Sequence, residues 1–312
     1  SKTAFCKHRR SLNLLCKFKE KAVPVCHENA DFALFYSEKG IFMSHKIGIT
    51  ACSNPMHPSF SADLARLCQI LRELGFDPVL SPCLYDNGSG FSGTGAERAD
   101  ALMNLYCDPE ITDIFDVSGG DMANEVLPYL DFSIIAAPAS ASGDTVIHKI
   151  VNAVTTATGN ESMLYQVRNL LYDHSAEQIT LFQNAFSGQS PSLFDLPCTF
   201  LQGDHMEGVM IGGNIRCFLK LAGTDFQPDF RGKILLLEAM GGGVPQMVTF
   251  LSQLKMMHAF EQINGILLGT FSQMERDQLT PDMPQLVRQA AGPDLPIART
   301  PYIGHGTDAH AA

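Results

Sequence analysis

Two residues that could carry acid–base chemistry, Glu238 and His305, both lie close to glycines. Glu238 ends the apolar run ILLLE and is soon followed by the glycine triplet Gly241–Gly243. A carboxylate at such a position must be paired, hydrogen-bonded or functional, because burying it alone is costly. His305 lies between two glycines in YIGHGTD, where an exposed histidine can act as a general base at neutral pH. A carboxylate at a strand end is more commonly a structural cap, and a lone histidine is more commonly an ordinary surface residue.

A third stretch, VSGGDMANEVLPYLD over residues 117–131, has the pattern of a strand end, a glycine turn and a helix start. The apolar positions of the expected helix share one face: Met122, Val126 and Leu130. A junction of this kind directs backbone N–H groups and the positive end of a helix dipole toward one point. Gly119, Gly120 and Asp121 are therefore candidates to bind a carboxylate or phosphate. A tight turn of the kind any parallel α/β unit needs is the simpler explanation.

Composition and charge exclude several classes of function. The formal net charge of -11 argues against a protein that holds nucleic acid by its phosphates. The nine cysteines include no CxxC pair and show no metal-ligand spacing, which favours reduced thiols and predicts neither a metal nor another cofactor. No apolar run approaches the length of a membrane span or a signal-peptide core. We therefore expect a cytoplasmic protein without membrane contacts.

The elements that must position these residues alternate between strand and helix over residues 46–187. Expected strands are Lys46–Cys52, Asp77–Leu84, Ile111–Val117 and Ile134–Ala137; expected helices are Ser61–Leu74, a helix to Tyr106 that Thr94 and Glu97 begin as a capping box, one ending at Thr158, and Ser175–Phe186. This alternation predicts a parallel, doubly wound α/β sheet. Ligands bind such sheets at the carboxyl ends of the strands, where Gly119 and Gly120 fall.

The Ser/Pro-rich segment 188–197 marks a predicted domain boundary. We expect a domain over residues 188–312 that carries Glu238 and His305, a first domain over 46–187, and an atypical basic arm over 1–45. Expected elements of the second domain are strands Thr199–Gln202, Gly208–Ile211, Lys233–Leu237 and Ile263–Phe271, and helices Ile215–Leu221, Pro245–Phe260 and Met283–Ala291. The triplet Gly212–Asn214 is expected to turn into the first of these helices.

Seven stretches in order give the chain from Lys46 to His310 a resemblance to a known family. They are IGITACSNP, FSGTGAERADALMNLYCDPEI, VSGGDMANEVLPYLD, IGGNIRCFLKLAGT, ILLLEAMGGGVPQM, GILLGTF and YIGHGTDA. The chain resembles the LD-carboxypeptidases (muramoyltetrapeptide carboxypeptidases), serine peptidases, and their relatives that inactivate the antibiotic microcin C. The resemblance implies a parallel α/β domain beside a C-terminal mainly β domain, with the active site between them. It also implies a Ser-His-Glu triad in which Glu238 and His305 take part and lie within hydrogen-bond reach, and a glycine pair that lines the pocket.

The nucleophile is where the chain departs from the family. The family serine lies in a Gly-Tyr-Ser-Asp motif, whereas this chain reads SASGDTVIH over residues 140–148. Aligning on Thr145 and His148 makes Ser142 the nucleophile, and of the four motif residues only this serine is retained. A second register makes Thr145 the nucleophile, but its methyl group crowds attack. Ser142 acting only as a helix cap is the structural alternative.

Two hypotheses follow from these residues and the resemblance. In the first, the protein is a hydrolase that releases a C-terminal D-amino acid from murein peptides in peptidoglycan recycling, at a rate impaired by the altered motif. In the second, it is a catalytically inactive homologue that binds a peptide or aminoacyl-nucleotide ligand in the same cleft. The expected partner is a small peptide with a free C-terminal carboxylate, and the resemblance implies a homodimer.

Overall fold

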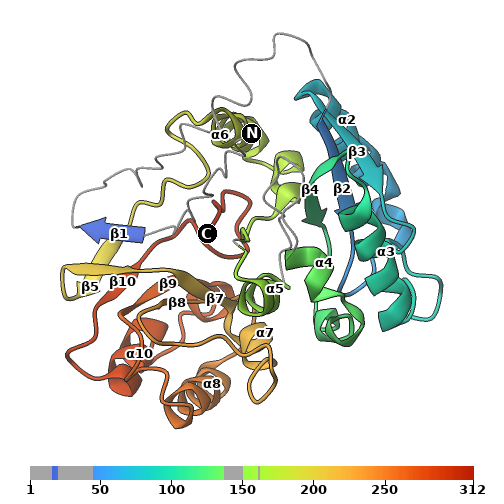
Figure 1. Ribbon diagram of the computed structural model, residues 1–312. Helices are drawn as coiled ribbons and strands as arrows, with labels where there is room; N and C mark the ends of the chain where they lie inside the picture. The colour runs from blue at the N-terminus through green and yellow to red at the C-terminus, as the bar shows by residue number, and fades with distance from the viewer. Residues whose placement is uncertain (1–15, 20–44, 137–149, 161) are drawn as a thin grey trace, which may run out of the picture.

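The computed structural model describes residues 16–19, 45–136, 150–160 and 162–312. Ser142 and Thr145, the two candidate nucleophiles, lie outside these ranges. The mixed α/β architecture predicted from the sequence is confirmed, with a three-stranded and a five-stranded sheet as its two main layers. Figure 1 shows the first sheet, in blue and green, beside the second, in yellow to red.

The first sheet is fully parallel and has helices on both faces. Its strand order is β3-β2-β4, formed by β3 (Phe76–Leu80), β2 (His45–Thr50) and β4 (Ile111–Asp116). One face packs on α2 (Ser61–Glu73), η4 (Val167–Leu171) and α6 (Ser175–Ser187). The other face packs on α3 (Gly95–Cys107), α4 (Phe132–Ala136) and α5 (Val151–Thr158). The doubly wound arrangement expected from the alternating pattern is thus present.

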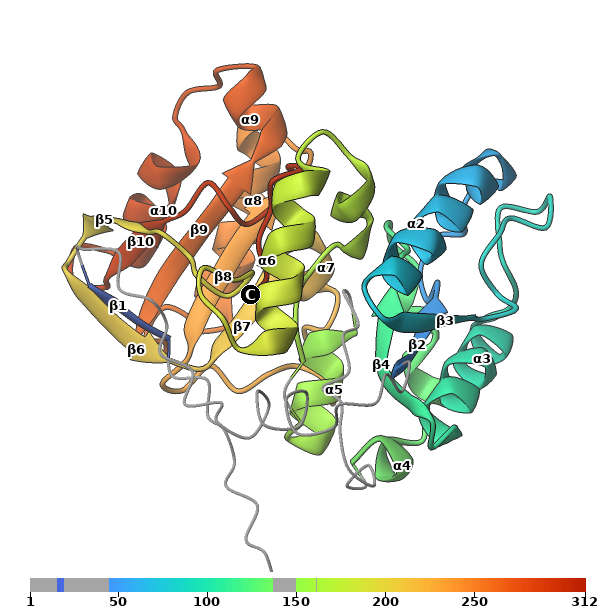
Figure 2. The same ribbon diagram turned by 90° about the horizontal axis from the view of Figure 1, so that it is seen from above.

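The second sheet is parallel except at one edge. Its order is β5-β10-β9-β8-β7, formed by β5 (Thr199–Gln202), β10 (Ile297–Arg299), β9 (Gly265–Phe271), β8 (Ile234–Ala239) and β7 (Met210–Asn214). Only β5 runs antiparallel to its neighbour β10. One face packs on α7 (Ile215–Leu219), α8 (Val244–Met256), α9 (Ser272–Arg276) and α10 (Met283–Ala291). Figure 2 shows this sheet and the first sheet from above.

We call residues 46–187 the first half of the molecule and residues 188–312 the second half. A short strand from the basic arm pairs with a strand of the second half. β1 (Cys16–Lys19) pairs antiparallel with β6 (His205–Gly208), with Cys16 opposite Gly208. This strand is absent from the predicted elements, because the arm has no sustained hydrophobic period. The assignment of the whole arm as a separate unit stays a prediction.

The predicted strand Ile134–Ala137 is wrong where the structure describes it. Residues 132–136 form the helix α4 instead. Asp131 starts it, since its Oδ1 accepts a hydrogen bond of 2.9 Å from the N–H of Ser133. A short apolar run cannot be assigned to strand or helix by periodicity alone, and here the preceding aspartate was the signal that mattered.

The glycine turn is not followed by the predicted α-helix. Two 3₁₀ helices take its place, η2 (Ala123–Glu125) and η3 (Leu127–Tyr129). Pro128 has no N–H with which to continue an α-helical ladder. Val126 and Leu130 are buried as the pattern predicted. The dipole of a long helix therefore does not contribute at Gly119 and Gly120.

The predicted turn at Gly212–Asn214 is also wrong. These residues extend the strand β7 instead.

Thr94 and Glu97 form the predicted capping box at the start of α3. The N–H of Glu97 donates to Thr94 Oγ1 at 3.2 Å, and the N–H of Thr94 donates to Glu97 Oε2 at 2.8 Å. We expect Thr94→Ala to lower the free energy of unfolding by about 1 kcal/mol, measured by urea denaturation. Thr180→Ala is the control, because Thr180 bonds only to Ala176 inside α6. Equal losses in both variants would contradict a capping contribution.

Candidate active site

Glu238 and His305 meet in the structure, as predicted. Nδ1 of His305 lies 2.8 Å from Oε2 of Glu238. Only 7% of the Glu238 side chain is exposed, against 34% for His305. A buried carboxylate therefore holds one ring nitrogen of a histidine whose ring reaches solvent. Because Nδ1 faces the carboxylate, Nε2 is the nitrogen that remains for proton exchange.

Glycine at position 269 makes room for this pair. Gly269 lies in β9, next to β8, and a Cβ added to it would lie 3.0 Å from the Cβ of Glu238 and 2.4 Å from the carbonyl oxygen of Ile303. The pairing of β8 with β9 also shifts register between Leu237 and Ala239, at Glu238 itself. Sequence reasoning missed Gly269, although a glycine inside a strand pattern is a recognised sign of close backbone approach.

The turn that carries His305 is held against β9. The N–H of Thr270 donates to the carbonyl oxygen of Ile303 at 2.8 Å. Gly304 has a φ of +146°, and an added Cβ there would lie 1.9 Å from Thr270 Oγ1. Only glycine fits this conformation and this contact. The glycine before His305 thus brings the turn close enough to β9 for the ring to reach Glu238.

Residues after His305 run into the first half of the molecule. Leu164 and Ala312 exchange two backbone hydrogen bonds, and the N–H of Ala311 donates at 2.9 Å to the carbonyl oxygen of Leu193, a residue that packs in the core of the first sheet. Ala311 is fully buried in the same core cluster as Ile47 of the first sheet. The position of His305 is consequently tied to both halves of the molecule.

Asn54 shapes the glycine turn. Its N–H donates to the carbonyl oxygen of Gly119 at 3.0 Å, and its Oδ1 accepts from the N–H of Asp121 at 2.8 Å. Gly120 has a φ of +105°, and a Cβ added there would lie 1.9 Å from Cγ of Asn54. Asn54 lies in the loop after β2, so this contact was not visible from the turn's own sequence. The Asp121 N–H already donates to Asn54, and a substrate contact by Asp121 stays a prediction.

The charge of Asp121 is overcompensated by two cations of the second half. Arg216 Nη2 lies 3.1 Å from Asp121 Oδ1, and Lys220 Nζ lies 2.5 Å from the same oxygen. Lys220 also donates to the carbonyl oxygen of Asp121 at 2.9 Å. One carboxylate against two cations leaves a formal charge of +1, which favours an anion at the turn rather than repelling it.

A buried arginine supports the loop that carries Asn54. Arg98 is only 1% exposed, and its Nη1 donates to the carbonyl oxygens of Cys52 at 2.7 Å and Ser53 at 3.3 Å. Its Nη2 pairs with Glu125. The guanidinium thus joins the loop after β2 to the segment after the glycine turn. The sequence pattern did not mark Arg98, because its position in α3 gives no sign of its distant partners.

The thiol of Cys52 behind this loop is unsuited to nucleophilic chemistry. Cys52 is fully buried, and this burial, reinforced by the nearby charge of Asp116, raises the pKa of its thiol well above the usual value. A thiol with a raised pKa stays protonated at neutral pH and is a poor nucleophile. A cysteine mechanism based on Cys52 is therefore disfavoured.

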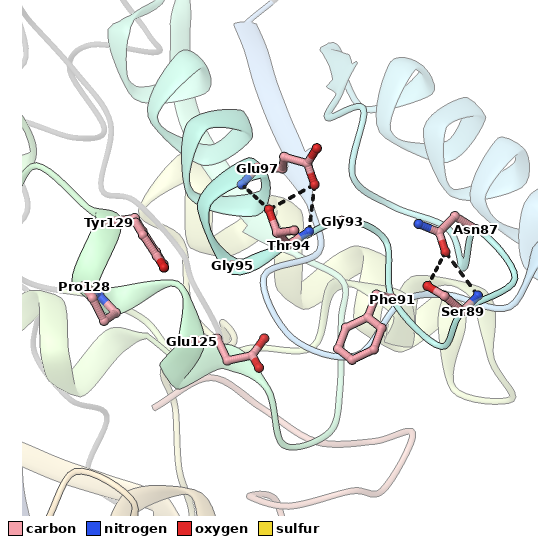
Figure 3. Close-up of a pocket in the computed structure, with 10 residues that line it drawn as sticks. All are labelled: Asn87, Ser89, Phe91, Gly93, Thr94, Gly95, Glu97, Glu125, Pro128 and Tyr129. Atoms are coloured by element: carbon pink, nitrogen blue, oxygen red, sulfur yellow. Dashed lines mark hydrogen bonds between the residues drawn. The ribbon is translucent and has the colours of Figure 1, made fainter.

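A separate hollow of about 530 Å³ lies at the start of α3 and does not include the Glu238–His305 pair. Figure 3 shows Thr94 and Glu97 bonded to each other, with the ring of Phe91 on one side and Tyr129 on the other. Both carboxylates that line the hollow are already engaged, Glu97 by Thr94 and Glu125 by Arg98. We therefore take the Glu238–His305 pair, a histidine base held by a buried carboxylate, as the candidate active site.

The described part of the chain contains neither a metal-ligand cluster nor a membrane-spanning helix. In residues 16–19, 45–136, 150–160 and 162–312, no three His, Cys, Asp or Glu side chains gather as metal ligands would. None of the helices in those ranges is long and apolar enough to cross a bilayer.

Comparison with known proteins defines first the class and then the family. The family models that match this chain describe carboxypeptidases. It matches the LD-carboxypeptidase N-terminal domain over residues 47–165 and the LD-carboxypeptidase C-terminal domain over residues 207–312. The chain belongs to the LD-carboxypeptidase family. Glu238, His305 and the glycine turn all fall inside the matched ranges.

Relatives in this family carry two kinds of name. The probable murein peptide carboxypeptidase of Bacillus subtilis is 28% identical over 248 residues, covering 77% of this chain and 76% of the relative. The microcin C7 self-immunity protein MccF of Escherichia coli is 25% identical over 257 residues, covering 72% and 74%.

Solved structures show the same fold at low identity. MccF in complex with glutamyl sulfamoyl guanosine superposes with a TM-score of 0.74 at 19% identity, covering 86% of this chain and 90% of that one. An MccF-like protein from Bacillus anthracis has a TM-score of 0.71 at 18% identity, with the same coverage. The mixed α/β, two-domain class of fold predicted from the sequence agrees with these structures.

Proposed function

We propose that this protein is an LD-carboxypeptidase-type serine hydrolase that releases a C-terminal D-amino acid from murein peptides. The observation that carries the proposal is the 2.8 Å contact between Nδ1 of His305 and the buried carboxylate of Glu238. The Bacillus subtilis relative, named as a probable murein peptide carboxypeptidase, supports the substrate class. We assign the activity to peptidoglycan recycling in the cytoplasm by a homodimer, on the basis of the family resemblance.

In the proposed reaction, Ser142 attacks the carbonyl carbon of the last peptide bond. Nε2 of His305 takes the serine proton and then gives it to the leaving amine of the D-amino acid. Glu238 holds the other ring nitrogen, which fixes the tautomer and stabilises the imidazolium that forms. Water then hydrolyses the acyl-enzyme by the same proton transfers in reverse.

The glycine turn is proposed to receive the terminal carboxylate of the peptide. Gly119 lets a ligand approach the backbone, because a Cβ added there meets no described atom within 4 Å. Two cations and one carboxylate give the adjoining Asp121, Arg216 and Lys220 a formal charge of +1, which suits a carboxylate. This preference for a free C-terminus is what makes the proposed hydrolase a carboxypeptidase.

One observation favours a second candidate, a homologue that binds its ligand without turnover. Residues 140–143 read SASG where the family has Gly-Tyr-Ser-Asp, so that only the serine of the motif is retained. MccF, a relative at 25% identity, has been solved with glutamyl sulfamoyl guanosine bound. The second candidate therefore takes an aminoacyl-nucleotide or peptide ligand in the same cleft.

Release of D-alanine from murein tetrapeptide tests both candidates, with a D-amino acid oxidase assay as the readout. We expect slow turnover by the unaltered protein, a loss of at least about a thousandfold in Ser142→Ala, and little change in Thr145→Ala. Loss in Thr145→Ala alone would assign the nucleophile to Thr145. No release by the unaltered protein, together with tight binding of an aminoacyl sulfamoyl nucleotide, would favour the binding homologue.

A further inference from the structure

We infer that Asn169, a residue of the first half of the molecule, positions the general base His305. Asn169 lies in η4, which packs against α2 and α6 on one face of the first sheet. It touches neither Glu238 nor the ring of His305 in any hydrogen bond that the structure gives it, so its role is that of a positioning residue. Its consequence for turnover rests on the proposed function.

The turn around His305 has two backbone hydrogen bonds of its own, from the N–H of His310 to the carbonyl oxygen of Tyr302 at 2.6 Å and from the N–H of Ala309 to that of Gly306 at 3.3 Å. His305 stands between Gly304 and Gly306, and glycine backbone has the widest conformational freedom of any residue. Contacts from outside the turn add to these bonds in fixing the backbone on either side of the ring. Before the histidine, this restraint is the 2.8 Å hydrogen bond from the Thr270 N–H to the carbonyl oxygen of Ile303.

Asn169 supplies the corresponding restraint after the histidine. Its Nδ2 donates two long hydrogen bonds of 3.4 Å, to the carbonyl oxygens of Gly306 and Ala309. Asn169 is only 1% exposed, so water does not replace the amide readily. The carbonyl of Gly306 is one residue from His305, and fixing it sets where the ring points.

The side chain at position 169 must therefore be a buried, uncharged donor. Alanine would leave the carbonyl oxygens of Gly306 and Ala309 without the amide. Aspartate keeps the shape of asparagine but presents oxygens to those carbonyls, so it repels them. The two substitutions thus remove the same restraint by different means, one by loss of the donor and one by replacing the donor with a charged acceptor.

The test compares Asn169→Ala and Asn169→Asp with a matched control, Asn264→Ala. Asn264 also donates through Nδ2 to two backbone carbonyl oxygens, those of Glu207 at 2.8 Å and Gly232 at 3.2 Å, but none of its partners belongs to the His305 turn. The first readout is the Nδ1 resonance of His305 in ¹⁵N-histidine-labelled full-length protein, assigned with His305→Gln. The second is kcat and KM for release of D-alanine from murein tetrapeptide. Melting temperatures are recorded for all variants.

We expect both Asn169 variants to shift or broaden the His305 Nδ1 resonance and to lower kcat about ten- to a hundredfold, with KM little changed. Asn264→Ala should lower the melting temperature without moving the resonance or kcat. An unchanged resonance in folded Asn169→Asp would overturn the inference. If the unaltered protein releases no D-alanine, the proposed function fails, yet the resonance alone still decides whether Asn169 positions His305.

Discussion

Glu238→Gln should lower kcat/KM on murein tetrapeptide by about three to four orders of magnitude, with the fold intact. Glutamine fills the same space but has no charge to stabilise the imidazolium that forms on His305. Its amide can also present Nε2 to the ring, which would favour the wrong tautomer. Because Glu238 is buried in β8 and Nδ1 of His305 lies 2.8 Å from it, solvent cannot substitute for the lost carboxylate. Steady-state kinetics with a circular dichroism spectrum of each variant is the measurement.

A second glutamate–histidine pair provides the matched control. Nδ1 of His258 lies 2.7 Å from Oε2 of Glu261, and both side chains are more than half exposed. Glu261→Gln breaks a contact of the same chemistry at the surface, where such pairs contribute little. We expect its kcat/KM to equal that of the unaltered protein. A similar kcat/KM for Glu238→Gln and Glu261→Gln would show that Glu238 does not orient the base.

Gly120→Ala should disrupt the glycine turn, whereas Gly119→Ala should leave the fold unchanged. At Gly120 the φ of +105° disfavours alanine, and its Cβ would lie 1.9 Å from Cγ of Asn54. We expect a loss of about 2–4 kcal/mol in the free energy of unfolding, together with loss of turnover. A Cβ added at Gly119 meets no described atom within 4 Å, so its stability should change by no more than about 0.5 kcal/mol.

The Gly119 variant also tests where the substrate binds. If the terminal carboxylate lies against this turn, the added methyl group occupies its space and raises KM without destabilising the protein. Urea denaturation and steady-state kinetics on both variants separate the two effects. A Gly119→Ala variant with unaltered KM would place the carboxylate elsewhere. A Gly120→Ala variant as stable as the unaltered protein would show that Asn54 yields to the new methyl group.

A site residue could be predicted when the residues around it in the sequence already indicated its role. Glu238 was marked by a charge at the end of an apolar run, and His305 by the glycines around it; the family resemblance supplied their contact. Asn54, Arg98 and Asn169 act through partners far away in the chain. The local sequence around a buried side chain does not indicate which distant carbonyl group it will bond to.

Errors in the predicted elements have a related cause. The run at Ile134–Ala137 was too short for its periodicity to decide between strand and helix, and the structure has α4 over Phe132–Ala136. After the glycine turn, Val126 and Leu130 are buried as expected, because the apolar pattern reports burial. It does not report the hydrogen-bond ladder, and Pro128 helps make that segment two 3₁₀ helices rather than one α-helix.

The polar contacts between the two halves have a consequence for motion. Asp121 pairs with Arg216 and Lys220, Asn152 of α5 exchanges two hydrogen bonds with the backbone of Gly212, and Leu164 exchanges two more with Ala312. A hinge needs contacts that pivot about a single axis, whereas these joins use three different pairs of segments. Swinging the halves apart would break several hydrogen bonds, at about 1 kcal/mol each. We therefore expect ligand exchange to rely on local fluctuations rather than on the domain closure that many two-domain enzymes use.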